Sequence, residues 1–88
     1  MIDTNSTVIW TSQAASYTTT KTGIAYKVPA GQDAWEVAKS LFDMRKLQLR
    51  FDTYTRNHDS FLVLVDLGPK KQKALYWPRV SALKKVAV

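Results

Sequence analysis

The order of hydrophobic and polar positions predicts strands in the first third of the chain. The apolar run Val8-Ile9-Trp10 predicts a short strand over residues 7–12, because a tail seldom carries Trp beside two β-branched residues. The Ser- and Thr-rich residues 17–22 are expected to continue as extended chain, with Gly23 supplying a turn or bulge. In residues 24–28 the larger apolar side chains occupy every second position, as in a half-buried strand.

A helical period appears between residues 33 and 46. Asp33 and Glu36 have the spacing of a capping box, in which the Asp33 carboxylate accepts from the backbone N–H of Glu36. Acidic residues lie in the first turn and basic residues in the last, as the helix dipole favours. One face is apolar and consists of Ala34, Val37, Ala38, Leu41 and Phe42. We therefore predict one long helix over residues 33–46 that packs on a sheet through this face.

After the helix the period changes to two. Leu47, Leu49 and Phe51 share one side of a predicted strand, and polar residues occupy its other side. Residues 61–65 are apolar at every position, which is typical of a central strand, so Leu62 and Val63 should be buried. A further strand is predicted over residues 74–77, and it is expected to form a meander with the two preceding strands. Residues 81–88 favour a short helix, although the last three could also pair as a strand.

These elements predict a single α+β domain over residues 1–88, with residues 1–6 as an N-terminal tail. The order is β-β-α-β-β-β, in which about five strands form a small antiparallel sheet. One long helix covers one face of this sheet, and a short element ends the chain. The other face of the sheet is the expected location of the functional surface.

Composition narrows the class of protein. A chain of 88 residues can form only one small core. The absence of cysteine excludes disulfides, thiolate metal sites and a cysteine nucleophile, and it favours the cytoplasm or the nucleoid. No apolar run approaches the roughly 20 residues of a membrane span, and the first residues do not resemble a signal peptide. We therefore expect neither secretion nor contact with a membrane.

The charge of the protein lies in its second half. The net charge is +6, and the sequence pI is about 9.8. Residues 1–44 contain three lysines and four acids, a net charge of −1, whereas residues 45–88 contain ten bases and three acids, a net charge of +7. Such an asymmetry favours a polyanionic partner, although charge also serves solubility.

Motifs for enzymatic chemistry are weak. His58, the only histidine, precedes Asp59 and Ser60 directly, but adjacent residues cannot converge as nucleophile, base and orienting group. The three glycines are far apart and form no phosphate loop, and the carboxylates are scattered, so no catalytic residue, metal or cofactor is predicted. A metal-free ribonuclease using His58, Asp59 and Arg56 remains a lesser alternative, because these groups could supply a base, an acid and a cation.

Basic residues interleaved with aromatic residues favour binding of single-stranded or structured nucleic acid, DNA or RNA. Cations contact phosphates, and Tyr or Trp rings provide flat faces for bases. Trp77 could equally belong to the core, and the run of lysines after Pro69 could be an ordinary soluble hairpin tip. The predicted contact residues are Arg50, Tyr54, Arg56, Lys70, Lys71, Lys73, Trp77 and Arg79.

The alternative class is a protein-binding module or inhibitor. Such a protein would act through an edge strand, for which residues 17–22 are the candidate, or through its basic surface on an acidic protein partner. Homodimerisation through the same edge belongs to this hypothesis. The sequence does not separate it from nucleic-acid binding.

Overall fold

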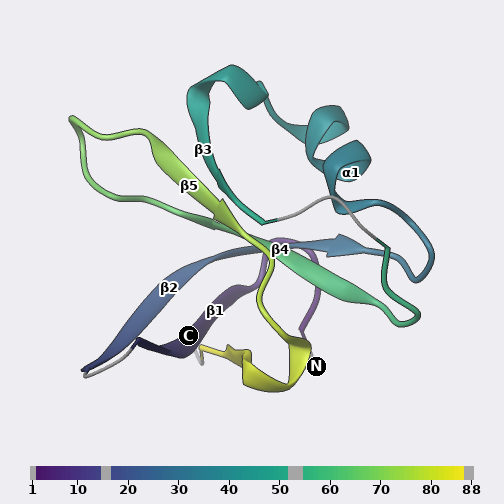
Figure 1. The fold of residues 1–88 in the computed structure, drawn as a ribbon, viewed down its shortest axis with the longest axis horizontal. Coiled ribbons are helices and arrows are strands. Elements are labelled where there is room, and N and C mark those ends of the chain that lie inside the picture. The colour runs from purple at the N-terminus through teal and green to yellow at the C-terminus, as the bar shows by residue number, and fades with distance from the viewer. Residues whose placement is uncertain (1, 15–16, 52–54, 87–88) are drawn as a thin grey trace.

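One mixed sheet of six strands, in the order β3-β5-β4-β2-β1-β6, forms the frame of the protein in the computed structural model (Figure 1). The structure describes residues 2–14, 17–51 and 55–86. Along the chain, the elements are β1 (Thr7–Ala14), β2 (Tyr17–Val28), α1 (Ala34–Leu41), the 3₁₀ turn η1 (Met44–Lys46), β3 (Leu47–Arg50), β4 (Ser60–Val65), β5 (Lys73–Tyr76), the 3₁₀ turn η2 (Val80–Ala82) and β6 (Lys84–Lys85). The described chain thus has the predicted α+β architecture with a single α-helix.

The strand order differs from the predicted antiparallel meander. β5 lies between β4 and β3, and it pairs antiparallel to β4 but parallel to β3. β4 and β5 are consecutive in the chain and form a hairpin through residues 66–72, so β5 takes the place beside β4. β3 is therefore left at the edge of the sheet, on the far side of β5. The expectation of about five antiparallel strands is wrong in these details, because strand order depends on non-local pairing.

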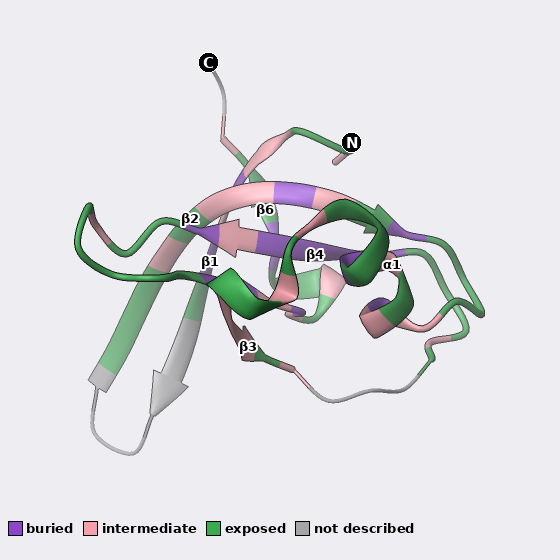
Figure 2. Ribbon diagram, turned by 90° about the horizontal axis from the view of Figure 1, so that it is seen from above, coloured by how far each residue is buried: buried purple, intermediate pink, exposed green. Residues whose placement is uncertain are grey.

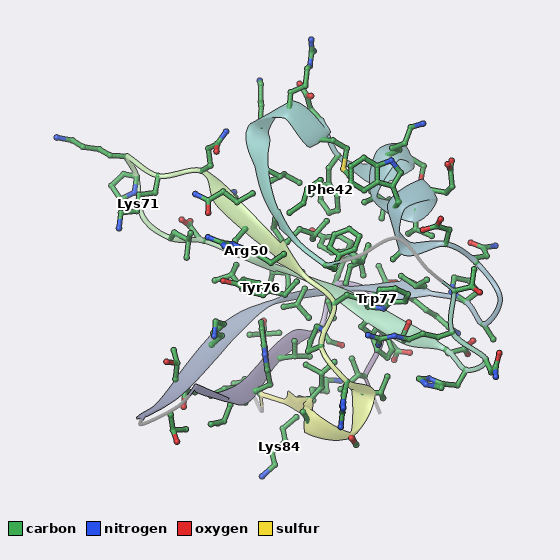
Figure 3. All side chains as sticks on the ribbon, in the orientation of Figure 1. Phe42, Arg50, Lys71, Tyr76, Trp77 and Lys84 are labelled. Atoms are coloured by element: carbon green, nitrogen blue, oxygen red, sulfur yellow. The ribbon has the colours of Figure 1, made fainter. Side chains whose placement is uncertain are left out.

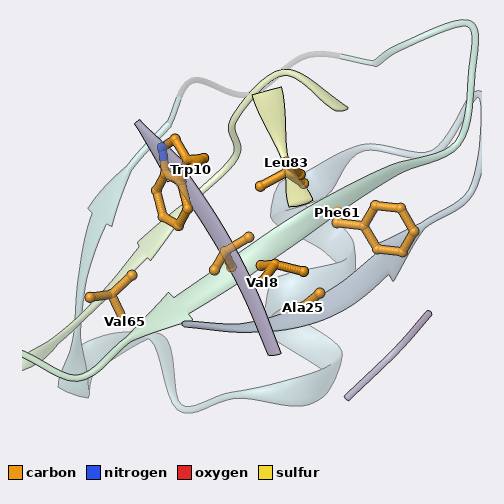
Figure 4. Close-up of a cluster of buried hydrophobic side chains, with 7 residues drawn as sticks. Val8, Trp10, Ala25, Phe61, Val65 and Leu83 are labelled. Atoms are coloured by element: carbon orange, nitrogen blue, oxygen red, sulfur yellow. The ribbon is translucent and has the colours of Figure 1, made fainter. Parts of the chain in front are cut away.

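β4 is the central strand and has buried side chains on both faces. Leu62 and Val63 are both fully buried, which confirms the prediction for this apolar run. One cluster gathers side chains from β1, β2, β4 and the segment before β6, namely Val8, Trp10, Ala25, Phe61, Val63, Val65 and Leu83 (Figure 4). The second lies against α1 and consists of Val28, Ala34, Ala38, Leu62, Leu75 and Trp77.

The helix is shorter than predicted. Asp33 is its N-cap, but its carboxylate accepts from the backbone N–H of Trp35 at 2.9 Å rather than from Glu36. The helix stops at Phe42, which has an extended backbone, and the Asp43 carboxylate then accepts from the N–H of Arg45 and starts η1. An Asp side chain that binds nearby backbone groups competes with continued helix in this way.

Only part of the predicted apolar face of the helix is buried. The two alanines, Ala34 and Ala38, are fully buried, whereas Leu41 is 50% exposed. The expectation that Leu41 packs on the sheet with the rest of this face is wrong, because the early end of α1 leaves it outside the core. Phe42, just after the helix, packs edge-on against Tyr26 with ring centroids 4.9 Å apart.

Gly23 does not introduce the predicted turn. β2 runs through it without interruption, and a Cβ atom at this position would collide with the carbonyl oxygen of Leu64 and the side chain of Val63. Pairing of β2 with β4 begins at Ile24. Before Gly23, β2 pairs only with β1 within the described chain, so the two strands leave the body as a ribbon with exposed threonines (Figure 2).

The C-terminal segment closes the first cluster. The predicted short helix is replaced by η2 and the two-residue strand β6, which pairs with Val8 and Ile9 of β1. Leu83, between η2 and β6, is buried in the cluster. At the other end of the chain, Asn5 donates its backbone N–H to the carbonyl oxygen of Ala25 at 2.7 Å.

Candidate functional site

An aromatic ring with cations beside it lies on the sheet face that α1 does not cover. The parallel register places Arg50 of β3 directly beside Tyr76 of β5 (Figure 3). The Lys21 Nζ lies over the Tyr76 ring, 5.5 Å from its centroid. The Tyr76 ring also packs edge-on against Trp10, with ring centroids 5.5 Å apart. Tyr76 is therefore partly buried and held in place.

Strand geometry explains why these residues share a face. Side chains alternate between the two faces of a strand, and Leu75 points into the cluster beneath α1. Its neighbour Tyr76 therefore points to the opposite face, as does Arg50, which lies between Leu49 and Phe51 of that same cluster. The Arg50 guanidinium is exposed and donates one hydrogen bond, to the side-chain oxygen of Gln48 at 3.1 Å.

The loop from β4 to β5 carries three further cations. Lys70, Lys71 and Lys73 are exposed, and no hydrogen bond or ion pair ties their side chains to another described residue. Gly68, at φ 119°, allows the turn, and the Asp66 carboxylate accepts from its N–H at 2.9 Å. Figure 3 shows Lys71 at the far tip of this hairpin.

We group Lys21, Arg50, Lys70, Lys71, Lys73 and Tyr76 as the basic surface. β5 connects its two parts, since the three steps from Lys73 to Tyr76 span about 10 Å of extended strand. An odd number of steps places the Lys73 side chain on the opposite side of β5 from Tyr76, so the surface wraps around the edge of the sheet from the lysine loop to the Tyr76 face. Sequence reasoning missed Lys21 and Tyr76. The alternation of Tyr76 with Leu75 and Trp77 was a usable signal, whereas Lys21 required the register of β1, β2 and β5.

Arg56 and Trp77 contact each other within the fold. The Arg56 guanidinium lies 3.9 Å from the centroid of the Trp77 ring and donates to the carbonyl oxygens of Trp77 and Pro78 at 2.8 and 3.0 Å. Trp77 is only 6% exposed and donates its indole N–H to the Ser60 hydroxyl at 2.8 Å. The buried indole offers no open ring to a base, so we leave both residues out of the basic surface.

Of the two other predicted contact residues, one lies apart from this surface and the other is not described by the structure. Arg79 is exposed but precedes η2, beyond the opposite end of β5 from the lysine loop. Tyr54 lies outside the described residues.

The residues from His58 to Ser60 have separate partners. The Ser60 hydroxyl is fully buried against Trp77, while the His58 ring contacts the backbone oxygen of Asp59. The Asp59 carboxylate accepts from the N–H of Ala30 at 2.9 Å and pairs with Lys27 at 3.4 Å. These contacts hold the pKa of Asp59 below its ordinary value, and the hydrogen bond from Ala30 is the largest cause.

Neither a cluster of metal ligands nor a membrane-spanning helix is found in the part of the chain that the structure describes. Within residues 2–14, 17–51 and 55–86, no three His, Cys, Asp or Glu side chains are grouped as metal ligands would be. None of the helices in the described chain is long and apolar enough to span a membrane. The chain matches no protein-family model, no curated protein and no solved structure.

Proposed function

We propose that the protein binds single-stranded DNA or RNA through the basic surface. The observation that carries this proposal is the placement of the Tyr76 ring beside Lys21 and Arg50, on the strand that follows the loop of three exposed lysines. Cations that track a phosphate backbone beside an aromatic ring are the combination used by single-strand binders. The proposal involves no catalytic step, metal or cofactor, and it fits a cytoplasmic or nucleoid protein.

The lysine loop supplies the electrostatic part of binding. Its three ammonium groups have no protein partner among the described residues, so contact with phosphate breaks no existing ion pair. Each phosphate that is neutralised releases counterions, and affinity therefore falls steeply with salt. Arg50 can add a forked contact to phosphate, because a guanidinium presents several donors in one plane.

Tyr76 supplies contact with an unstacked base. Its ring is fixed by Trp10 on one side, so little ordering is needed when a base packs against the remaining accessible part. Bases of a duplex are already stacked on one another, whereas bases of a single strand are free to meet the ring. We therefore expect single strands to bind more tightly than a duplex of equal length.

The test is a titration of fluorescently labelled single-stranded DNA, RNA and duplex DNA at several salt concentrations. We expect a slope of log affinity against log salt of about −0.7 per phosphate contact for single strands. Changing Lys70, Lys71 and Lys73 together to Ala should flatten this slope and weaken binding.

A matched triple change at Lys39, Lys84 and Lys85 controls for total charge, because these exposed lysines lie on α1 and β6. It should leave the slope close to that of the wild-type protein. Absence of binding to all three probes at about 50 mM salt would refute the proposal, as would an equal loss from both triple variants.

A further inference from the structure

β1 has an open edge beyond its short pairing with β6. β6 pairs only with Val8 and Ile9, whereas β1 continues to Ala14. Beyond Ile9, no described strand pairs with β1 on this side. Residues 7–14 contain no charged residue and no proline, which are the usual means of blocking such an edge.

The direction of the free backbone groups follows from one hydrogen bond. Val86 donates its N–H to the carbonyl oxygen of Thr7 at 2.9 Å, so the backbone groups of Thr7 point towards β6. In an antiparallel strand every second residue points the same way. The N–H and C=O groups of Thr11 and Gln13 therefore point outwards at the open edge, in the plane of the sheet.

A groove lies where the C-terminal segment turns away from this edge. Ala82 bonds back to the carbonyl oxygen of Arg79 within η2 rather than across to β1. This leaves a groove of about 470 Å³, whose lining includes Trp10, Thr20 and Lys84. The groove adjoins the outward backbone groups of Thr11, so a strand on the edge could place one side chain in it.

The strands and the turn that form the groove carry only positive charge. The sequence has no Asp or Glu between residues 4 and 32 or after residue 66, so β1, β2, η2 and β6 contain no acid. Lys84, which lines the groove, and its neighbour Lys85 on β6 are both exposed. Figure 3 shows Lys84 on the side of the molecule away from Lys71, so this region is separate from the lysine loop.

We infer that the open edge of β1 binds an extended acidic peptide segment of a partner protein by strand addition. The outward groups of the edge alternate between donor and acceptor, and an extended peptide matches both. The phosphates of a nucleic-acid backbone only accept hydrogen bonds, so contact through them would leave the carbonyl groups of the edge unmatched. A second copy of this chain would bring its own Lys84 and Lys85 to a symmetric contact, where like charges repel. The inference does not depend on nucleic-acid binding.

A defined peptide tests the inference. The probe is a labelled, end-blocked peptide of about eight residues that alternates Glu and Val, with its binding followed by fluorescence anisotropy. The control peptide has the same sequence with every backbone nitrogen methylated, which keeps the charge and removes the donors. We expect the control to bind at least about tenfold more weakly, since several backbone hydrogen bonds are lost.

Two proline variants locate the binding edge. Thr11→Pro removes an outward N–H that takes no part in the pairing of β1 with β2, so an edge strand should tolerate it. Thr18→Pro makes the same change on the opposite edge of the ribbon, since Thr18 pairs with Gln13 and also points away from the partner strand. We expect about a tenfold loss of peptide affinity for Thr11→Pro and none for Thr18→Pro.

Three results would overturn the inference. The methylated peptide could bind as tightly as the unmethylated one, which would show attraction by charge alone. A single-stranded oligonucleotide could compete with the peptide and share its sensitivity to Thr11→Pro, which would make nucleic acid the occupant. The protein could also sediment as a dimer that Thr11→Pro dissociates, which would make a second copy the occupant.

Discussion

At the scale of single residues, the contact of Arg56 with Trp77 shows how far residue type alone can predict function. An arginine near a tryptophan is a signature both of stacking on nucleic acid and of a cation–π contact within a fold. The structure has the second arrangement, in which Arg56 covers the Trp77 ring and binds two carbonyl oxygens beyond it. Sequence could not decide between the two, because Arg56 and its partners Trp77 and Pro78 are more than 20 residues apart in the chain and meet only through tertiary packing.

The buried hydrogen bond from Trp77 to Ser60 predicts a clear stability effect. Ser60→Ala would remove the buried hydroxyl that accepts from the indole N–H beside the second cluster, at a cost of about 1–3 kcal/mol in the free energy of unfolding. The control is Ser40→Ala, because Ser40 is exposed and should change stability by less than about 0.5 kcal/mol. Urea denaturation of both variants measures the difference, and equal midpoints would contradict this account.

The lowered pKa of Asp59 predicts a pH-dependent contribution to stability. The N–H of Ala30 and the ammonium of Lys27 favour the ionised form, so the unfolded chain takes up this proton first as pH falls. The contribution is present above the usual aspartate pKa of about 3.9 and is lost as pH falls through the lower folded value. Asp59→Asn should therefore be less stable than the wild type at pH 7, by a margin that shrinks below about pH 4. Thermal denaturation across this range measures the margin, and a constant margin would contradict the assignment.

At the scale of elements, the sequence pattern correctly predicted features that depend on residues close together in the chain. The apolar run in β4 and the alternation in β3 identified both strands and their buried sides. The length of α1 was missed, because the capping of η1 by Asp43 competes with the helix although the apolar pattern continues. The position of β3 beyond β5 was also missed, because no local feature of either strand specifies which of its neighbours it pairs with.

Gly23 marks the point where the β1–β2 ribbon leaves the body of the sheet. Gly23→Ala should destabilise the protein by about 1–3 kcal/mol, because the added methyl group meets the backbone of Leu64. Thr22→Ala, at the exposed neighbouring position, should change stability by less than about 0.5 kcal/mol. Chemical denaturation of the two variants compares these costs. A Gly23→Ala protein as stable as the wild type would show that β2 and β4 separate readily at this point.

At the scale of the whole molecule, folding divides the basic residues of the second half into separate regions. The lysine loop and Arg50 lie on one side, whereas Lys84 and Lys85 lie on β6, beside the open edge of β1. Lys21, from the otherwise acidic first half, joins the former group through its contact with Tyr76. Charge counted along the sequence therefore predicted a polyanionic partner but not which cations act together.

The most direct test of the proposed function is an NMR titration of ¹⁵N-labelled protein with a short single-stranded oligothymidine. Binding at the basic surface should shift the amide signals of Lys21, Arg50, Tyr76 and residues 70–73, and the signals of α1 should stay in place. The shifts should diminish as salt is added, because the contacts are mainly electrostatic. Shifts confined to α1 or to the β1 edge, or no shifts at about 50 mM salt, would contradict the account.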